Sequence, residues 1–235
     1  MASIKLYQFG PVTGRESASP FCVKLHYALR YKRLPFEAVN LATPNEVKKY
    51  NTRGKMPVLA YDGTLIPDST DAVRYLEQRH PEPRLYPTDE RERAQALMME
   101  DWADESLYWH IVYENWLIDD QYDKFAVEIF GGMPAAIRPL VKIIARRKTR
   151  GNLIGQGFGR MKPEEHRQML YEQLDWLNGI ADGGFLCGKE PSIADAAVAA
   201  QITCIVSPFM PVAAAEARKR TRLMNWYERA MAAFR

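Results

Sequence analysis

In the first eighty residues, short runs that alternate apolar and polar side chains are separated by segments in which apolar side chains recur at helical spacing. Residues 4–9 and 36–41 alternate apolar and polar side chains, which predicts two strands. Between them, apolar side chains recur at helical spacing up to Tyr31, behind a Ser-Pro pair that suits a helix start. Residues 44–50 predict a second, shorter helix. The pattern therefore opens as strand, helix, strand, helix.

A hairpin and a third helix complete this part of the chain. Strands are expected near residues 57–61 and 64–66, on either side of Asp62-Gly63, a dipeptide typical of a hairpin turn. Asp68-Ser69 then predicts the cap of a helix that ends before Pro81. A helix between the first two strands favours parallel pairing through a right-handed crossover. We therefore predict an α/β domain over residues 1–81.

The pattern of apolar residues changes after the proline-rich segment 81–88. A second, all-helical domain is expected over residues 90–235. Apolar and aromatic residues recur at helical spacing from Ala94 to Trp116, whereas residues 119–132 are less regular. Further helices are expected at 134–148, 163–181 and 213–234. Ser192 and Asp195 have the spacing of a capping box, and the nearly all-apolar helix behind them should be buried.

Composition limits the function classes. The 235 residues are 47% apolar and 26% charged, as in an ordinary globular protein, and a net charge of +3 gives no strong case for nucleic acid or an acidic membrane surface. The three cysteines (Cys22, Cys187 and Cys204) are odd in number and far apart, which indicates a reducing compartment. No signal peptide, membrane span or metal-ligand spacing is recognised. The expectation is a cytoplasmic protein without a metal.

Five short motifs, taken in order, resemble the cytosolic glutathione transferase superfamily. They are SPFC at 19–22, GKMPVL at 54–59, DS at 68–69, YL at 75–76 and SIAD at 192–195. The resemblance covers essentially the whole chain. It implies a thioredoxin-like N-terminal domain, an all-α C-terminal domain, glutathione as co-substrate and a homodimer. The motifs FGGMP at 130–134, GQGFGR at 155–160 and FLCGKEP at 185–191 look more closely like the metaxin and failed-axon-connections branch.

Ser19 is the candidate catalytic residue. It precedes Pro20 at a predicted helix N-terminus, where exposed amides and the helix dipole favour an anion. The nucleophile in glutathione chemistry is the thiolate, and a serine hydroxyl can donate a hydrogen bond to its sulfur. The reactive serine or cysteine of the resembling family stands in this position. Ser19 is also expected to cap its helix, and Ser17 and Tyr7 are alternatives for the catalytic role.

The resemblance assigns the remaining glutathione contacts. The backbone at Met56-Pro57 would hold the cysteinyl unit, and Asp68-Ser69 the γ-glutamyl end. Lys55 would pair with the glycyl carboxylate, unless it is merely solvated. In the family, the first long helices of the second domain line the cavity for the electrophile. Candidates there are Tyr108, Trp109 and Trp116, which suit helix packing equally well.

The leading hypothesis is an enzyme, a glutathione transferase acting on a small apolar electrophile. One alternative is a non-catalytic binding or scaffold protein on the same fold, because activity is less assured in the metaxin-like branch. A third idea is a thiol oxidoreductase using Cys22, although Ser19 replaces the first cysteine of a CxxC motif and leaves no resolving thiol there. The basic run 138–150 predicts a solvated helix end, or a contact with anionic lipid or protein.

Overall fold

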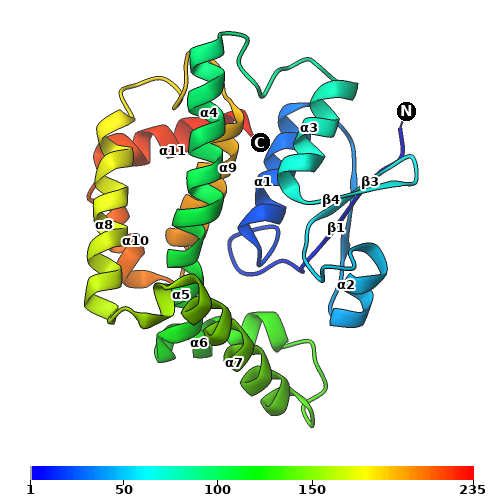
Figure 1. Ribbon diagram of the computed structural model, residues 1–235, viewed down its shortest axis with the longest axis vertical. Coiled ribbons are helices and arrows are strands. Elements are labelled where there is room, and N and C mark those ends of the chain that lie inside the picture. Colours follow the sequence, from blue (N-terminus) through cyan, green and yellow to red (C-terminus); the bar gives the residue numbers. More distant parts are fainter. Residues whose placement is uncertain (1) are drawn as a thin grey trace.

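A four-stranded sheet forms the N-terminal part of the protein, of which the computed structural model describes residues 2–235 (Figure 1). The strand order is β2-β1-β3-β4. β1 (Ile4–Gln8) pairs in parallel with β2 (Glu37–Asn40) and antiparallel with β3 (Val58–Tyr61). β3 and β4 (Thr64–Pro67) form the expected hairpin. The predicted crossover and hairpin are both confirmed.

Three helices cover the sheet. α1 (Pro20–Tyr31) and α3 (Ser69–Arg79) pack on the face to which Leu6 of β1 points. α2 (Pro44–Tyr50) packs on the other face, to which Tyr7 points. Because neighbouring residues of a strand point to opposite faces, the alternating pattern of β1 serves both layers at once.

The rest of the chain is helical, which confirms the predicted fold class of a thioredoxin-like α/β domain followed by an all-α domain. In chain order the helices are α4 (Glu90–Trp102), a π-helical turn (Ala103–Leu107), α5 (Tyr108–Leu117), α6 (Asp119–Phe130), α7 (Arg138–Gln156), a 3-10 turn (Phe158–Arg160), α8 (Pro163–Ile180), α9 (Ile193–Ile205), α10 (Pro211–Arg218) and α11 (Thr221–Ala233). Across residues 2–235, no helix combines the length and apolar character needed to cross a bilayer.

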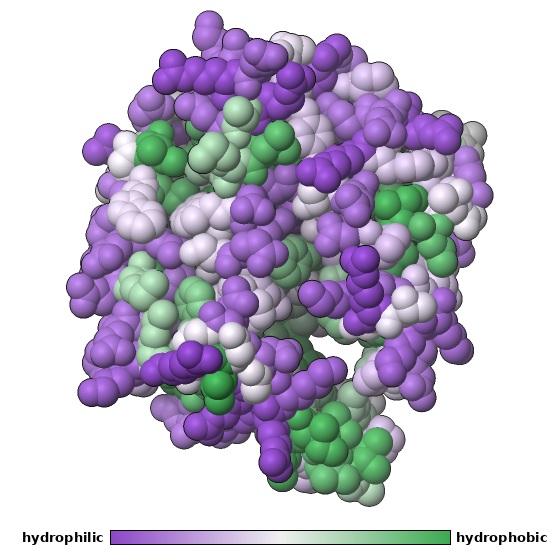
Figure 2. All heavy atoms as spheres, viewed as in Figure 1, coloured by the Kyte–Doolittle hydropathy of each residue, from purple (hydrophilic) through white to green (hydrophobic). Residues whose placement is uncertain are grey.

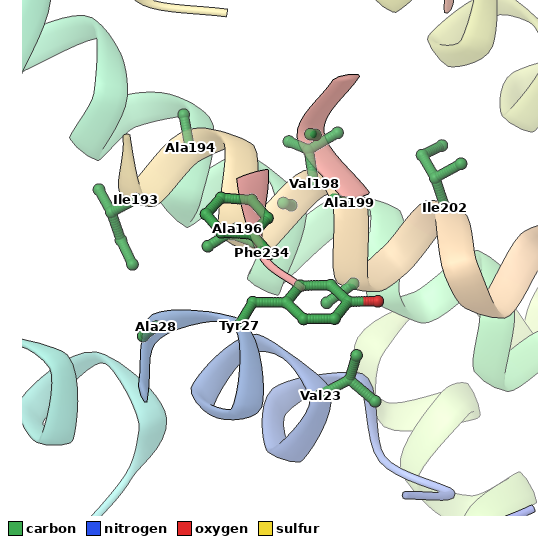
Figure 3. Close-up of a cluster of buried hydrophobic side chains, with 14 of the residues drawn as sticks. Val23, Tyr27, Ala28, Ile193, Ala194, Ala196, Val198, Ala199, Ile202 and Phe234 are labelled. Carbon is green, nitrogen blue, oxygen red and sulfur yellow. The ribbon is translucent and has the colours of Figure 1, made fainter. Parts of the chain in front are cut away.

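The main apolar core joins the two parts of the molecule. Every residue of α9 is buried, as its nearly all-apolar pattern predicted, and α9 packs against α1 (Figure 3). Tyr27 of α1 stacks on Phe234 near the C-terminus, with ring centroids 5.5 Å apart. Its hydroxyl lies 2.8 Å from Thr203 Oγ1 of α9. The helix that carries Ser19 at its start is therefore held by both the sheet and the helical domain.

The predicted capping box at the start of α9 is present and is wholly buried. Asp195 accepts hydrogen bonds from the backbone N–H and the hydroxyl of Ser192, both at 2.9 Å. It also accepts from Leu186 N at 2.9 Å and from Trp226 Nε1 at 2.8 Å. Its carboxylate therefore ties the loop before α9 and the helix α11 to the first turn of α9.

Two helix predictions in the middle of the chain need correction. Residues 119–132 are not irregular, because residues up to Phe130 form α6, which buries Tyr122 and Phe125. The helix expected at 134–148 starts four residues later, where Arg138 donates hydrogen bonds to the carbonyls of Gly131 and Met133. It continues to Gln156 because Leu153 is fully buried against α5.

The final predicted helix is divided into α10 and α11. Arg220 stands between them and reaches α8, where it donates hydrogen bonds to Tyr171 O at 3.1 Å and to the Asp175 carboxylate at 2.8 Å. It also donates to the Glu216 carbonyl at 2.7 Å, which occupies an acceptor at the end of α10. These tertiary contacts interrupt a pattern that would otherwise favour one helix.

Two completely buried histidines lie between α5 and α8. The rings of His110 and His166 are 4.8 Å apart, and none of their four nitrogens has a hydrogen-bond partner among the described residues. Tyr113 stacks on His166 at 3.9 Å. Burial, with a smaller contribution from His166, lowers the pKa of His110 to about 3.

This shift predicts a loss of stability in acid. The pKa of His110 is lower in the folded state than in the unfolded chain, so the unfolded state binds the extra proton below about pH 6.5. Between pH 7 and pH 5, His110 should therefore cost about 2 kcal/mol of unfolding free energy. Denaturant titrations of wild type and His110→Phe at both pH values measure this. An equally steep pH dependence in the variant would assign the effect elsewhere.

Candidate glutathione site

Ser19 begins α1, as predicted, but its hydroxyl does not cap the helix. The residue is extended, with φ −100° and ψ 126°, and makes no side-chain capping hydrogen bond. Its backbone N–H instead donates to Ser17 Oγ at 3.2 Å, and Ser17 Oγ donates to the Phe9 carbonyl at 2.7 Å. The capping prediction was wrong, because the N–H groups of Cys22 and Val23 both donate to the Ser19 carbonyl at 3.1 Å and none donates to its hydroxyl. The Ser19 hydroxyl is thus free of capping, whereas Ser17 is fully buried and engaged.

Tyr7 and Cys22 have surroundings that suit packing. The Tyr7 ring stacks on Tyr50 of α2, with centroids 3.8 Å apart. Burial, followed by a hydrogen bond that the Tyr7 hydroxyl donates to Tyr50, raises the pKa of Tyr7. Burial raises the pKa of the Cys22 thiol to about 11, so at neutral pH this cysteine is a protonated core residue. A protonated thiol is a poor nucleophile, which argues against the oxidoreductase hypothesis.

A cavity of about 350 Å³ lies between the sheet domain and α4. Its sheet-domain wall is formed by the residues Phe21, Asn51, Arg53, Lys55, Met56, Pro57, Pro67, Asp68, Ser69, Thr70 and Arg74. The opposite wall is formed by Leu97, Glu100, Asp101, Asp104 and Glu105. The structure therefore brings together five of the six expected glutathione contacts. Ser19 is not among the lining residues, although it lies two positions before Phe21, which is.

The hairpin explains why two distant motifs meet at this cavity. Val58 pairs with Pro67, and the Asp68 N–H donates to the Pro57 carbonyl at 3.2 Å. The Met56–Pro57 peptide bond is cis. Just before this bond, the Lys55 carbonyl accepts a hydrogen bond from Asn51 Nδ2 at 2.9 Å, which closes the loop that leads into the hairpin.

Asp68 and Ser69 stand at the N-terminus of α3. Asp68 has a positive φ of 87°, and its Oδ1 accepts from Thr70 N at 2.8 Å and from Asp71 N at 3.4 Å. These bonds confirm the predicted cap and leave the second carboxylate oxygen outside it. Ser69 is only 2% exposed. A helix N-terminus with an adjacent serine suits a carboxylate, and the spare oxygen of Asp68 suits an ammonium.

The two walls of the cavity differ in charge, although the sheet-domain wall also carries the Asp68 carboxylate. Three basic residues, Arg53, Lys55 and Arg74, belong to the sheet-domain wall. The facing α4 and π-helical turn contribute four carboxylates and no basic residue. Such a cavity can hold a peptide that carries both carboxylates and an ammonium group.

A buried ion cluster behind the cavity was not predicted from the sequence. Lys24 of α1 is 1% exposed, and its Nζ lies 2.6 Å from both Glu100 Oε1 and Asp104 Oδ2. It also donates to Thr70 Oγ1 at 3.0 Å, and Thr70 donates to Glu100 at 2.8 Å. Burial raises the pKa of Asp104 to about 6, against the opposing pull of Lys24. The cluster ties α1, α3 and α4 together at the cavity floor.

One sequence signal could have pointed to Lys24. It lies between Val23 and Leu25 in a helix whose neighbouring positions are all apolar. A charged residue in such a helix needs a buried partner or a route to solvent. The partners are 76 and 80 positions away, so the sequence does not identify them.

The three aromatic candidates for the electrophile pocket do not line this cavity. Tyr108 packs on Phe21 at a centroid distance of 4.7 Å, and Trp109 packs edge-on against Tyr108 at 5.1 Å. Trp116 lies deeper in the helical domain, against Tyr122 and Phe125. Tyr108 is thus the one nearest to the cavity through its contact with Phe21.

Comparisons with known proteins agree with this architecture. The chain matches the family model of the glutathione S-transferase N-terminal domain over residues 20–122. It matches the model of the glutathione S-transferase C-terminal domain over residues 164–229. The chain belongs to the glutathione S-transferase superfamily. The metaxin-like branch is not shown by these matches.

Two curated relatives are similar to the chain in sequence. Protein LigF of Sphingobium sp. strain SYK-6 is 31% identical over 117 residues, which are 48% of the chain and 45% of LigF. Isoprene-epoxide glutathione S-transferase of Rhodococcus sp. strain AD45 is 26% identical over 203 residues, 83% of either protein. The aligned region thus spans less than half of the first relative and most of the second.

Solved structures show the same fold. The crystal structure of beta-etherase LigF superposes with a TM-score of 0.73 at 23% identity, covering 99% of the chain and 98% of LigF. A glutathione S-transferase from Methylobacillus flagellatus, crystallised with glutathione bound, gives a TM-score of 0.61 at 21% identity, covering 99% and 97%. The prediction of an enzyme is confirmed at the level of the family. The individual site residues remain predictions.

Proposed function

We propose that the protein is a glutathione transferase that binds glutathione in the cavity between the sheet domain and α4. One observation carries the proposal: the hairpin joins Met56-Pro57 to Asp68-Ser69 on one wall of the cavity, and that wall carries basic groups together with the Asp68 carboxylate. Glutathione has two carboxylates and one ammonium, so it matches both signs of charge. The glutathione bound in the Methylobacillus relative supports the same ligand.

In this proposal the tripeptide lies extended along the sheet-domain wall. Backbone groups at Met56 hold the cysteinyl unit in the manner of an added strand. The γ-glutamyl carboxylate meets Ser69 and the N-terminus of α3, and its ammonium meets the free oxygen of Asp68. Lys55 pairs with the glycyl carboxylate. This orientation directs the cysteinyl sulfur towards the start of α1.

Ser19 then stabilises the thiolate. Its hydroxyl donates a hydrogen bond to the sulfur, and the α1 dipole favours the negative charge. The thiol proton passes to solvent. The thiolate attacks an electrophilic carbon, a sulfur–carbon bond forms, and the bond from that carbon to its leaving group breaks. Two relatives are named for an epoxide and a β-ether, both of which offer a carbon–oxygen bond to such an attack.

The electrophile is proposed to be small and apolar, and to approach from the side of α5. Tyr108 forms the nearest part of that side through its contact with Phe21. Trp109 packs edge-on behind Tyr108, and Trp116, against Tyr122 and Phe125, is proposed for the end of the lining farther from the glutathione cavity. A homodimer in the cytoplasm, as the family resemblance implies, belongs to the same proposal.

A non-catalytic glutathione-binding protein is the second candidate, and one observation favours it. Ser19 is not among the cavity-lining residues, so glutathione could be held without activation of its sulfur. The finer resemblance to the metaxin-like branch points the same way. Calorimetric titration with glutathione, followed by a conjugation assay with a model electrophile, distinguishes the two. Binding without turnover supports the second candidate, and absence of binding by folded protein overturns both and leaves the scaffold protein on the same fold.

Ser69→Ala tests the γ-glutamyl position. Loss of one hydrogen bond to a charged group, about 1.5 kcal/mol, should weaken glutathione binding roughly tenfold. The effect should appear in Kd and KM and leave kcat nearly unchanged, because the contact is the same in the ground and transition states. The dipeptide Cys-Gly lacks the γ-glutamyl unit, so its affinity should not change in the variant. An equal loss for both ligands would contradict the assignment.

A further inference from the structure

The helix α7 presents an unusual outer face. Leu140, Ile143 and Ile144 are 61%, 66% and 57% exposed, and Ile137 just before the helix is 50% exposed. Positions 140, 143, 144 and 147 lie on one side of a helix, so Arg147 continues the same face. Figure 2 shows apolar side chains gathered at the lower end of the molecule, where Figure 1 has α7. This outer face (Leu140, Ile143, Ile144, Arg147, Lys148 and Arg150) lies within residues 123–163, between the two family-model matches.

The charge of α7 is entirely positive. Its 19 residues include six Lys or Arg and no Asp or Glu. The inward-facing cations are neutralised or bonded locally: Arg146 pairs with Asp119 at 2.6 Å, and Lys142 approaches Asp123 at 3.9 Å. No ion pair found within residues 2–235 involves the three outward cations Arg147, Lys148 and Arg150. Two acids of neighbouring α6, Asp119 and Asp123, thus pair with inward cations of α7, and the three outward cations have no acidic partner within residues 2–235.

We propose that the outer face of α7 docks on the surface of an anionic lipid bilayer. Leu140, Ile143 and Ile144 enter the boundary between headgroups and acyl chains, and Arg147, Lys148 and Arg150 contact lipid phosphates. An amphipathic helix with aliphatic residues and Lys/Arg lies in the plane of such an interface. The long basic side chains can follow the apolar ones inward while their charged ends stay at the headgroups.

Charge excludes the simplest alternative, a second copy of the chain on the same face. A two-fold interface brings a surface against itself. The outer face has cations and no acid, so self-pairing would oppose like charges across buried isoleucines. A protein partner would need an acidic groove around a convex helix, and protein interfaces favour aromatic anchors that this face lacks. A fluid anionic bilayer supplies both the apolar phase and the negative charge.

The test is flotation of the full-length protein with vesicles of phosphatidylcholine alone or mixed with phosphatidylglycerol. Wild type should float with the anionic vesicles only, and added salt should weaken the binding. The double variant Ile143→Ser/Ile144→Ser and the double variant Arg147→Gln/Lys148→Gln should each lose at least about tenfold in apparent affinity. These positions are exposed, so circular dichroism and thermal unfolding should stay as in wild type.

Matched controls come from other surfaces. Met98 is 73% exposed on α4, and Lys48 and Lys49 are exposed basic residues on α2. Met98→Ser and Lys48→Gln/Lys49→Gln should float like wild type. Absence of binding to anionic vesicles, or binding that the α7 variants leave unchanged, overturns the proposal. Concentration-dependent self-association that the α7 variants abolish, without vesicle binding, assigns the face to a second copy instead.

Insertion is measured at a single position. The three native cysteines are buried, so Ile144→Cys gives a selective site for an environment-sensitive fluorophore. Its emission should shift to the blue on addition of anionic vesicles. The same label at Met98→Cys should not respond. An equal shift at both positions would show adsorption without orientation and contradict docking through α7.

Discussion

Ser19→Ala is expected to raise the pKa of bound glutathione's thiol by about 1–2 units, because a hydrogen bond to a charged group contributes about 1.5–3 kcal/mol. At neutral pH, kcat with a model electrophile should fall about 10- to 100-fold, in proportion to the lost thiolate. The KM for glutathione should stay within about twofold, since the peptide contacts are unchanged. Ultraviolet titration of the thiolate in the complex and steady-state kinetics give the three quantities.

The pH profile separates this role from a structural one. Above the raised pKa the thiolate is fully formed without Ser19, so the variant's rate should approach that of wild type at high pH. A variant that is merely misfolded would stay slow at every pH. Tyr7→Phe keeps the stack on Tyr50 and should leave the thiol pKa unchanged. If Tyr7→Phe or Ser17→Ala raises that pKa and Ser19→Ala does not, the catalytic assignment moves to that residue.

Asp195→Ala is expected to cost about 3–5 kcal/mol of unfolding free energy, because it leaves four hydrogen-bond donors, three of them buried, without their acceptor. For a domain of this size, that corresponds to a fall in Tm of roughly 10 °C. The loss should extend beyond α9, since Trp226 of α11 and the loop at Leu186 depend on the same carboxylate. Circular dichroism during urea and thermal unfolding measures both quantities.

Asp182→Ala is the matched control for this change. Asp182 is exposed in the loop before α9 and contributes the same charge without the buried contacts. Its removal should alter the unfolding free energy by less than about 0.5 kcal/mol. A loss below about 1 kcal/mol in Asp195→Ala would mean that water or a neighbouring group replaces the carboxylate.

Much of the fold follows from local sequence. The alternation of β1, the Asp62-Gly63 turn and the caps at Asp68 and Ser192 depend on near neighbours, and the structure confirms each. The spacing of apolar residues along the chain likewise predicts the division into an α/β domain and an all-α domain. The helices that the sequence did not predict correctly depend on contacts with residues far away in the chain. Arg220 divides the last helix only because α8 offers it acceptors, and α6 becomes regular because Tyr122 and Phe125 are buried.

The candidate site divides in the same way. The sequence by itself determined that Met56-Pro57 and Asp68-Ser69 lie close together, because they flank a hairpin whose short turn leaves little choice of register. Only the tertiary structure decided what faces them. The acids of α4, the buried pairing of Lys24 with Glu100 and Asp104, and the engagement of Ser17 in place of Ser19 all join segments from separate helices and loops. Sequence spacing encodes contacts within a few residues, whereas charges that meet across domains are set by how the helices pack.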